Sequence, residues 1–230
     1  MRVTIITYDK PHLKTEQILQ SLSLDQDLEL SLLVVPFKER KKRTVLFRHR
    51  PDMLQGMDYK DLSLCYNVPV QKIFSFKERI KFNPDYVIVG GAGIIDQGYP
   101  SLYKIINVHP GLIPAARGLD SFKWSILNNL PLGITLHVID DIIDAGKVIY
   151  RVKTPILEND SLESLAKRHY NLEISVIGHF RTLLKSKDTD LCIPAMEANR
   201  RMPIDKERLV IDQFDNYKKI MQLSSGRFCS

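Results

Sequence analysis

Short apolar runs alternate along the chain with amphipathic segments, and this alternation favours strands joined by helices. Seven runs rich in apolar and β-branched residues predict strands at residues 2–7, 28–35, 70–74, 86–89, 103–108, 134–139 and 148–152. The run at 86–89 is apolar without alternation, as expected for a parallel strand that is covered on both faces.

Helical spacing of apolar residues predicts the intervening elements. Segments 12–22, 76–81, 121–129 and 161–184 read as helices, and the last is the longest, with Ser161 and Ser164 as caps. Residues 37–68 are charged and lack a clear period, so they predict an irregular connection.

Strands that alternate with helices predict an α/β fold with a doubly wound, mostly parallel sheet. We assign residues 1–185 to this domain and 186–230 to a short C-terminal extension, which is too small for a robust domain of its own. Residues 199–203 predict a hairpin or short helix in the extension. Ligands of such sheets bind beyond the carboxyl ends of the strands, where Asn107 and Asp144 both fall.

Composition places the chain among ordinary globular proteins, with 44% hydrophobic and 26% charged residues. No apolar stretch approaches the roughly 20 residues that span a bilayer, and the N-terminus does not read as a secretory signal. The three cysteines are scattered and lack metal-ligand spacing. We therefore expect a cytoplasmic protein without a membrane partner.

The net charge of +6 comes partly from a basic cluster at residues 38–50. Such a cluster is either a solvated loop or a rim that attracts anionic substrates. Aromatic residues do not interleave with the basic ones, so we do not expect a nucleic acid partner.

Candidate chemistry concentrates in Asn107, His109 and Asp144. An amide can hold a carbonyl group, an imidazole can stabilise an oxyanion, and a carboxylate can accept a proton. Asn107 and His109 are two positions apart, so a strand projects both to one side. Taken singly, each also has a bland interpretation as a turn residue or a packed histidine.

A metal site is the rival interpretation of His109, His137, Asp140, Asp141 and Asp144. No two of these ligands have the spacing of one helical face, and His137 sits inside an alternating strand where a packed histidine is expected. We therefore expect no metal. A Gly-x-Ser-x-Gly nucleophile motif is also missing from the sequence.

The ordered run from Asn107 to Gly146 resembles the folate-dependent formyltransferases, which move a formyl group from 10-formyltetrahydrofolate to an amine. Residues 107–114 match the family pattern Asn-x-His-Pro-Ser-Leu-Leu-Pro, except that Gly111 replaces serine and Ile113 replaces leucine. We expect Gly111 to make this loop more flexible. Asp144-Ala145-Gly146 matches the family's Asp-x-Gly turn.

This resemblance implies a Rossmann-like formyltransferase fold, with 10-formyltetrahydrofolate as co-substrate and Asn107, His109 and Asp144 as catalytic residues. It also implies a slot for the pterin ring. The residues carried over to that slot are Ala92, Gly93, Ile94 and Ile95, with Asp140, Ile142 and Ile143 in a loop that closes over the ring. Without the resemblance, the glycines at 90–93 predict a tight turn after a strand, because they do not follow the first strand as a dinucleotide motif does.

The amine acceptor is predicted from three further segments. Arg117-Gly118 and residues 199–205 resemble the branches that formylate nucleotide-linked amino sugars and methionyl-tRNA, whereas residues 118–121 resemble the branch that formylates glycinamide ribonucleotide. Members that act on methionyl-tRNA carry an additional C-terminal barrel, for which we expect no room in 230 residues. We expect a nucleotide-linked amino sugar used for polysaccharides, and the sequence allows a homodimer. A ribonucleotide enzyme and a non-catalytic folate or nucleotide binder are the alternatives.

Overall fold

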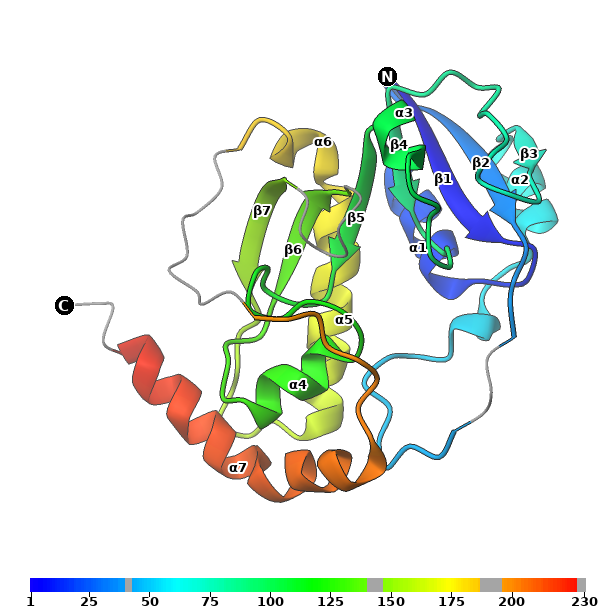
Figure 1. Cartoon of the computed structure of the whole chain (residues 1–230). Coiled ribbons are helices and arrows are strands. Elements are labelled where there is room, and N and C mark those ends of the chain that lie inside the picture. Colours follow the sequence, from blue (N-terminus) through cyan, green and yellow to red (C-terminus); the bar gives the residue numbers. More distant parts are fainter. Residues whose placement is uncertain (40–42, 140–146, 187–195, 227–230) are drawn as a thin grey trace. The chain divides into compact units, whose positions relative to one another are not determined.

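A single mixed sheet organises the fold of the computed structural model, which describes residues 1–39, 43–139, 147–186 and 196–226 (Figure 1). The strands are β1 (Arg2–Tyr8), β2 (Glu29–Val35), β3 (Val70–Lys72), β4 (Tyr86–Val89), β5 (Ile105–His109), β6 (Gly133–Val138) and β7 (Val148–Lys153). Their order is β3-β2-β1-β4-β5-β6-β7. The pairs β1–β2, β1–β4, β2–β3 and β4–β5 are parallel, and β6–β7 is antiparallel. The predicted doubly wound, mostly parallel sheet is confirmed.

Helices connect and follow these strands. They are α1 (Leu13–Leu22), α2 (Tyr59–Tyr66), α3 (Tyr99–Leu102), α4 (Ser121–Leu127), α5 (Leu162–Gly178), α6 (Phe180–Leu183) and α7 (Ile204–Gly226), with a 3₁₀ turn at Met53–Gln55. The predicted caps of α5 are confirmed, because Ser161 and Ser164 bond each other's backbone N–H groups. The segment predicted as one helix over 161–184 breaks at His179.

Three local predictions are wrong for identifiable reasons. Segment 37–68 contains α2, which Asp58 caps by accepting from Lys60 N and which ends at Asn67 in the left-handed region. Residues 76–81 form turns, because the Gln71 side chain bonds the carbonyl of Arg79 and the N–H of Lys81. Residues 199–203 are not helical, and Asn199 forms a parallel bridge with Gly118.

The chain divides into two compact units. Unit 1 comprises Met1–Lys41, Asp52–Asn107 and Val138–Asp141, and unit 2 comprises Lys42–Pro51, Val108–His137 and Ile142–Ser230. Residues of β1, β2, β4 and β5 form a core cluster of unit 1 together with Tyr99. The extension from residue 186 belongs to unit 2 by its contacts, while its predicted status as a separate segment remains a prediction.

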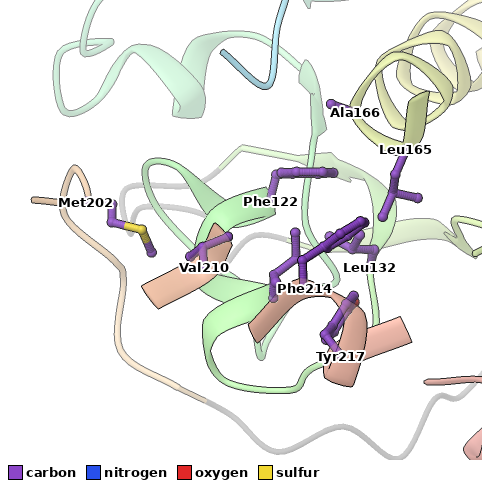
Figure 2. Close-up of a cluster of buried hydrophobic side chains, with 9 residues drawn as sticks. Phe122, Leu132, Leu165, Ala166, Met202, Val210, Phe214 and Tyr217 are labelled. Atoms are coloured by element: carbon purple, nitrogen blue, oxygen red, sulfur yellow. The ribbon is translucent and has the colours of Figure 1, made fainter. Parts of the chain in front are cut away.

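A hydrophobic cluster in unit 2 joins α4, α5 and α7 (Figure 2). Val210, Phe214 and Tyr217 of α7 pack on Phe122 of α4 and Leu165 of α5. The Tyr217 hydroxyl also donates to the carbonyl of Leu130 at 2.9 Å. Although α7 has 23 residues, none of the helices among the described residues combines the length and apolar character that a membrane span needs.

A buried carboxylate ties the basic segment to this cluster. Glu207 of α7 is fully buried and accepts from Arg43 Nη2 at 2.8 Å, Lys123 Nζ at 2.7 Å and Leu46 N at 2.7 Å. Arg50 forms a second ion pair with buried Glu173 of α5. Two arginines of the basic cluster therefore serve internal ion pairs, a use that neither sequence interpretation of the cluster considered.

We predict that Glu207→Gln lowers the free energy of unfolding by about 3 kcal/mol, because it removes the countercharge of buried Lys123 and one of the two carboxylates that pair with Arg43. Asp215→Asn is the matched control, since this carboxylate is 84% exposed and pairs with Lys218 on the same helix. The control should change stability by less than about 1 kcal/mol in a urea titration. Equal effects of the two substitutions would contradict a structural role for Glu207.

Candidate functional site

Asn107 and His109 lie at the end of β5, as the sequence predicts. The neighbouring residues Ile105, Ile106 and Val108 are buried, which fixes the strand on both sides of the pair. Asn107 is half-buried, and His109 is 4% exposed. A strand of this kind presents both polar side chains at the carboxyl end of the sheet, where ligands of doubly wound folds bind.

The His109 ring is held in one tautomer by its surroundings. Its Nε2 atom lies 2.6 Å from the carbonyl oxygen of Ala116 and 3.2 Å from the hydroxyl of Ser121. A carbonyl oxygen only accepts hydrogen bonds, so Nε2 carries a proton and donates. Nδ1 is therefore the nitrogen whose proton distinguishes the neutral from the cationic imidazole.

The loop that follows His109 is held through its own backbone. Its carbonyls accept hydrogen bonds from side chains and from backbone N–H groups. The side-chain donors are His169 to Pro110, Thr135 to Gly111, Arg151 to Ile113, His109 to Ala116 and Ser121 to Gly118. The backbone donors are Ala116 N to Leu112, Met196 N to Pro114 and Asn199 N to Arg117. Thr135 also accepts from Ile113 N at 3.0 Å. Leaving a buried carbonyl without its donor costs about 1–3 kcal/mol, so the loop has one favoured conformation.

Gly111 is part of this tight packing, and the expectation of a flexible loop is wrong. A Cβ atom at this position would lie 2.3 Å from the Ala116 oxygen and 2.8 Å from His109 Nε2. Both distances are shorter than any normal contact. The glycine therefore allows the Ala116 carbonyl to approach the histidine.

A second histidine lies beneath the loop. His169 of α5 is 2% exposed, and its Nε2 and Nδ1 atoms lie 3.3 Å from the Pro110 oxygen and 2.7 Å from the Thr154 hydroxyl. Burial lowers the pKa of His169 to about 4, and the positive charges of Arg50 and His109 act in the same direction against the opposing effect of Glu173. His169 is therefore neutral at physiological pH.

The glycine segment after β4 lies in unit 1. Gly90 N and Gly91 N both donate to the Ile6 carbonyl, and a Cβ at Gly91 would lie 2.7 Å from the Tyr8 ring. These contacts hold the glycine segment close to β1. The strand order reverses between β1 and β4, so this turn marks the switch point at which ligands of doubly wound sheets bind.

The residues predicted to hold the pterin ring divide by exposure. Ala92 and Ile95 pack partly against the core cluster of unit 1, whereas Ile94 is 86% exposed and Gly93 has open space around it. Asp140, Ile142, Ile143 and the predicted catalytic Asp144 lie outside the described residues.

His137 is a packed histidine, as its strand position predicts. It is 1% exposed, and its ring stands edge-on to that of His109 with the centroids 6.4 Å apart. Within the part of the chain that the structure describes, no three side chains of the metal-ligating types gather into a group that could hold an ion.

Sequence reasoning did not identify the residues that support His109, namely Ser121, Thr135, Arg151 and His169. A signal existed for His169, because it shares the buried face of α5 with Leu165, Ala166, Tyr170 and Glu173. A histidine and a glutamate on an otherwise apolar helix face indicate buried polar partners.

Residues 78–179 match a family model described as formyl transferase. The methionyl-tRNA formyltransferase of Ehrlichia canis is 32% identical to this chain over 119 residues, which make up 50% of this chain and 37% of that protein. The match spans less than half the length of this relative, and the same holds for two other methionyl-tRNA formyltransferases.

Two solved structures illustrate the similarity in fold. The phosphoribosylglycinamide formyltransferase from Bacillus halodurans is 22% identical with a TM-score of 0.58, and the match covers 80% of this chain and 96% of that one. The sugar N-formyltransferase from a Shewanella species is 18% identical with a TM-score of 0.56, and the match covers 92% of this chain and 86% of that one.

We predict that Gly111→Ala destabilises the protein by about 1–3 kcal/mol, because the added methyl group has to displace the Ala116 carbonyl. Gly93→Ala is the matched control, since nothing lies near the new methyl group there. Thermal unfolding measures the Tm of each variant, and only Gly111→Ala should show a lower Tm than the wild type. Loss of stability only at position 93 would contradict the packing described for the loop.

We predict that stability falls as the pH drops from 6.5 to 4. In the unfolded chain His169 has a pKa near 6.5. In the folded protein its pKa is lowered to about 4, so the ring binds a proton only when the pH falls to about 4. The unfolded state thus holds more protons in this window, and up to about 3 kcal/mol is lost. Urea titrations of wild type and His169→Gln across this window should show a weaker pH dependence in the variant.

Burial also lowers the pKa of His49, so His49→Gln separates the contribution of that residue. An unchanged pH dependence in His169→Gln would refute the buried neutral state of His169.

Proposed function

We propose that this chain transfers a formyl group from 10-formyltetrahydrofolate to the amine of a nucleotide-linked amino sugar, since residues 78–179 match a family model described as formyl transferase. The observation that carries the proposal is His109, fixed in one tautomer beside Asn107 at the end of β5. These two groups are suited to stabilise an oxyanion that develops on a formyl oxygen.

The proposed reaction is direct acyl transfer. The neutral amine attacks the formyl carbon, and the carbonyl electrons move to the oxygen, which the Asn107 amide and the Nδ1–H of cationic His109 stabilise. Asp144 takes the proton from the attacking nitrogen. The oxyanion then collapses, the bond between the formyl carbon and N10 breaks, Asp144 passes its proton to N10, and a formamide and tetrahydrofolate leave. Orientation of the two substrates alone can lower the barrier by roughly 7–11 kcal/mol.

The donor slot is proposed at residues 92–95, with Asp140, Ile142 and Ile143 above the ring. The support for this is the position of the segment at the switch point of the sheet and the large apolar side chain of Ile94, which is 86% exposed. A flat heterocycle covers such a side chain and gains from its burial.

The sugar acceptor is supported by two segments that hydrogen bond each other in unit 2. Gly118 bridges to Asn199, Leu119 N donates to the Asn199 carbonyl, and Trp124 Nε1 donates to the Arg200 carbonyl. These segments carry the Arg-Gly and 199–205 motifs that favour the sugar branch. The Shewanella sugar enzyme also matches a larger share of this chain than the Bacillus halodurans ribonucleotide enzyme does. Glycinamide ribonucleotide is the alternative acceptor.

We predict that Asn107→Ala and Asp144→Asn each lower turnover by about a hundredfold or more, because each removes a group that acts on the tetrahedral intermediate. Tetrahydrofolate release is the measurement. Asn128→Ala and Asp215→Asn, both at exposed positions of unit 2, are the matched controls and should keep full activity. Folded variants with turnover like that of the wild type would exclude the proposed mechanism.

We predict that Ile94→Asp weakens donor binding by at least about tenfold without loss of stability, since it removes an apolar contact from the slot at a position that is already exposed. Leu24→Asp is the control, because Leu24 is 83% exposed in the same unit. Titration with 10-formyltetrahydrofolate, followed by fluorescence or calorimetry, measures the affinity of each variant for the donor. Equal affinities would place the pterin ring elsewhere.

A further inference from the structure

His169 uses both of its ring nitrogens inside the core of unit 2. The Pro110 oxygen can only accept, so Nε2 carries the proton and donates to it at 3.3 Å. The neutral ring then leaves Nδ1 as an acceptor for the Thr154 hydroxyl at 2.7 Å. Thr154 lies directly after β7, and its own N–H donates to the Leu132 carbonyl. The ring thus links α5 and the end of β7 to the loop that follows β5.

The Pro110 carbonyl is the first backbone acceptor after His109. Its orientation sets the plane of the Pro110–Gly111 peptide, one residue beyond the catalytic histidine. The Nε2 atom of the His109 ring bonds the carbonyl of Ala116, which lies seven residues later in the same loop. The direction of the His109 ring therefore depends on both ends of the loop.

We propose that His169 is a positioning residue for formyl transfer, which fixes the Pro110 carbonyl and thereby the direction in which His109 presents Nδ1. This inference rests on the proposed function. The rings of His169 and Phe122 pack with their centroids 5.3 Å apart, and any apolar ring could make that contact. A residue that only filled space would therefore not need hydrogen bonds at both ring nitrogens.

Burial keeps the His169 ring neutral, and the charged groups around it are themselves engaged in ion pairs or ring contacts. Glu173 lies one turn further along α5 and pairs with Arg50. His49 stacks on the Phe122 ring that also contacts His169, and Lys123 is held by Glu207. His109 is the remaining titratable neighbour. Burial of the ring opposes its protonation, so the donor to Pro110 and the acceptor for Thr154 keep their roles over the pH range in which an amine acceptor reacts.

Two amide substitutions separate positioning from packing. In His169→Gln the side-chain nitrogen can reach the place of Nε2 and restore the donor to Pro110. In His169→Asn the shorter amide can reach Thr154 but not Pro110. The expected kcat of His169→Asn is about ten- to a hundredfold below wild type, with the KM values of donor and acceptor unchanged. His169→Gln should recover most of the lost kcat.

Nitrogen-15 spectra of the histidine rings supply a measurement that does not depend on turnover. At a pH at which the His109 ring is neutral, wild type and His169→Gln should show it in the Nε2–H tautomer, and His169→Asn should show a mixture of tautomers. The His109 signals are assigned from the spectrum of His109→Gln.

Three outcomes would overturn the inference: a wild-type kcat in His169→Asn, an equal loss of kcat in both variants, or an unchanged His109 tautomer in His169→Asn. If wild type releases no tetrahydrofolate with any nucleotide-linked amino sugar or with glycinamide ribonucleotide, the proposed function fails. The tautomer measurement then still decides the role of His169.

Discussion

The hydrogen-bonded backbone of residues 110–118 is the constraint on which the candidate site depends. Its carbonyls accept from the strand residues Thr135 and Arg151, from His169 of α5, and from the backbone of Met196 and Asn199 in the extension. Each buried acceptor would be costly to leave unpaired, so β6, β7, α5 and the extension together determine one loop conformation. That conformation places the Ala116 carbonyl against His109 and sets the tautomer of the ring. The chemistry proposed for His109 is thus a consequence of packing in the whole of unit 2.

The extension stabilises this arrangement through α7. Its apolar face completes the cluster with α4 and α5 (Figure 2). Glu207 of α7 pairs with Lys123 and Arg43 in one charge network. Burial of an ion pair adds little net stability by itself, but removal of one partner is expensive. The network therefore specifies where residues 43–50 lie more than it adds stability. Part of the positive charge that the sequence shows at residues 38–50 is used within the protein, at Arg43 and Arg50.

Local patterns predicted the parallel strands, α1, α4, α5 and the Ser161 cap, because apolar periodicity and capping residues report directly on secondary structure. The same reasoning missed α7, although Val210, Phe214, Tyr217 and Met221 have helical spacing, because the many charged residues between them suggested a polar tail. For the site, the positions of Asn107 and His109 follow from the end of a strand. The supports of His109 could not be predicted, since Ser121, Thr135 and His169 meet it or its loop only through the tertiary fold. Asp144 remains a prediction.

The most direct measurement follows the formyl carbon itself. Donor labelled with carbon-13 in the formyl group is incubated with the protein and a panel of nucleotide-linked amino sugars, with glycinamide ribonucleotide and with water alone, and the products are identified by mass spectrometry. The account predicts a labelled formamide on an amino sugar, formed together with an equal amount of tetrahydrofolate. Labelled formate without any formamide, or no release of tetrahydrofolate from a donor that binds, would contradict it.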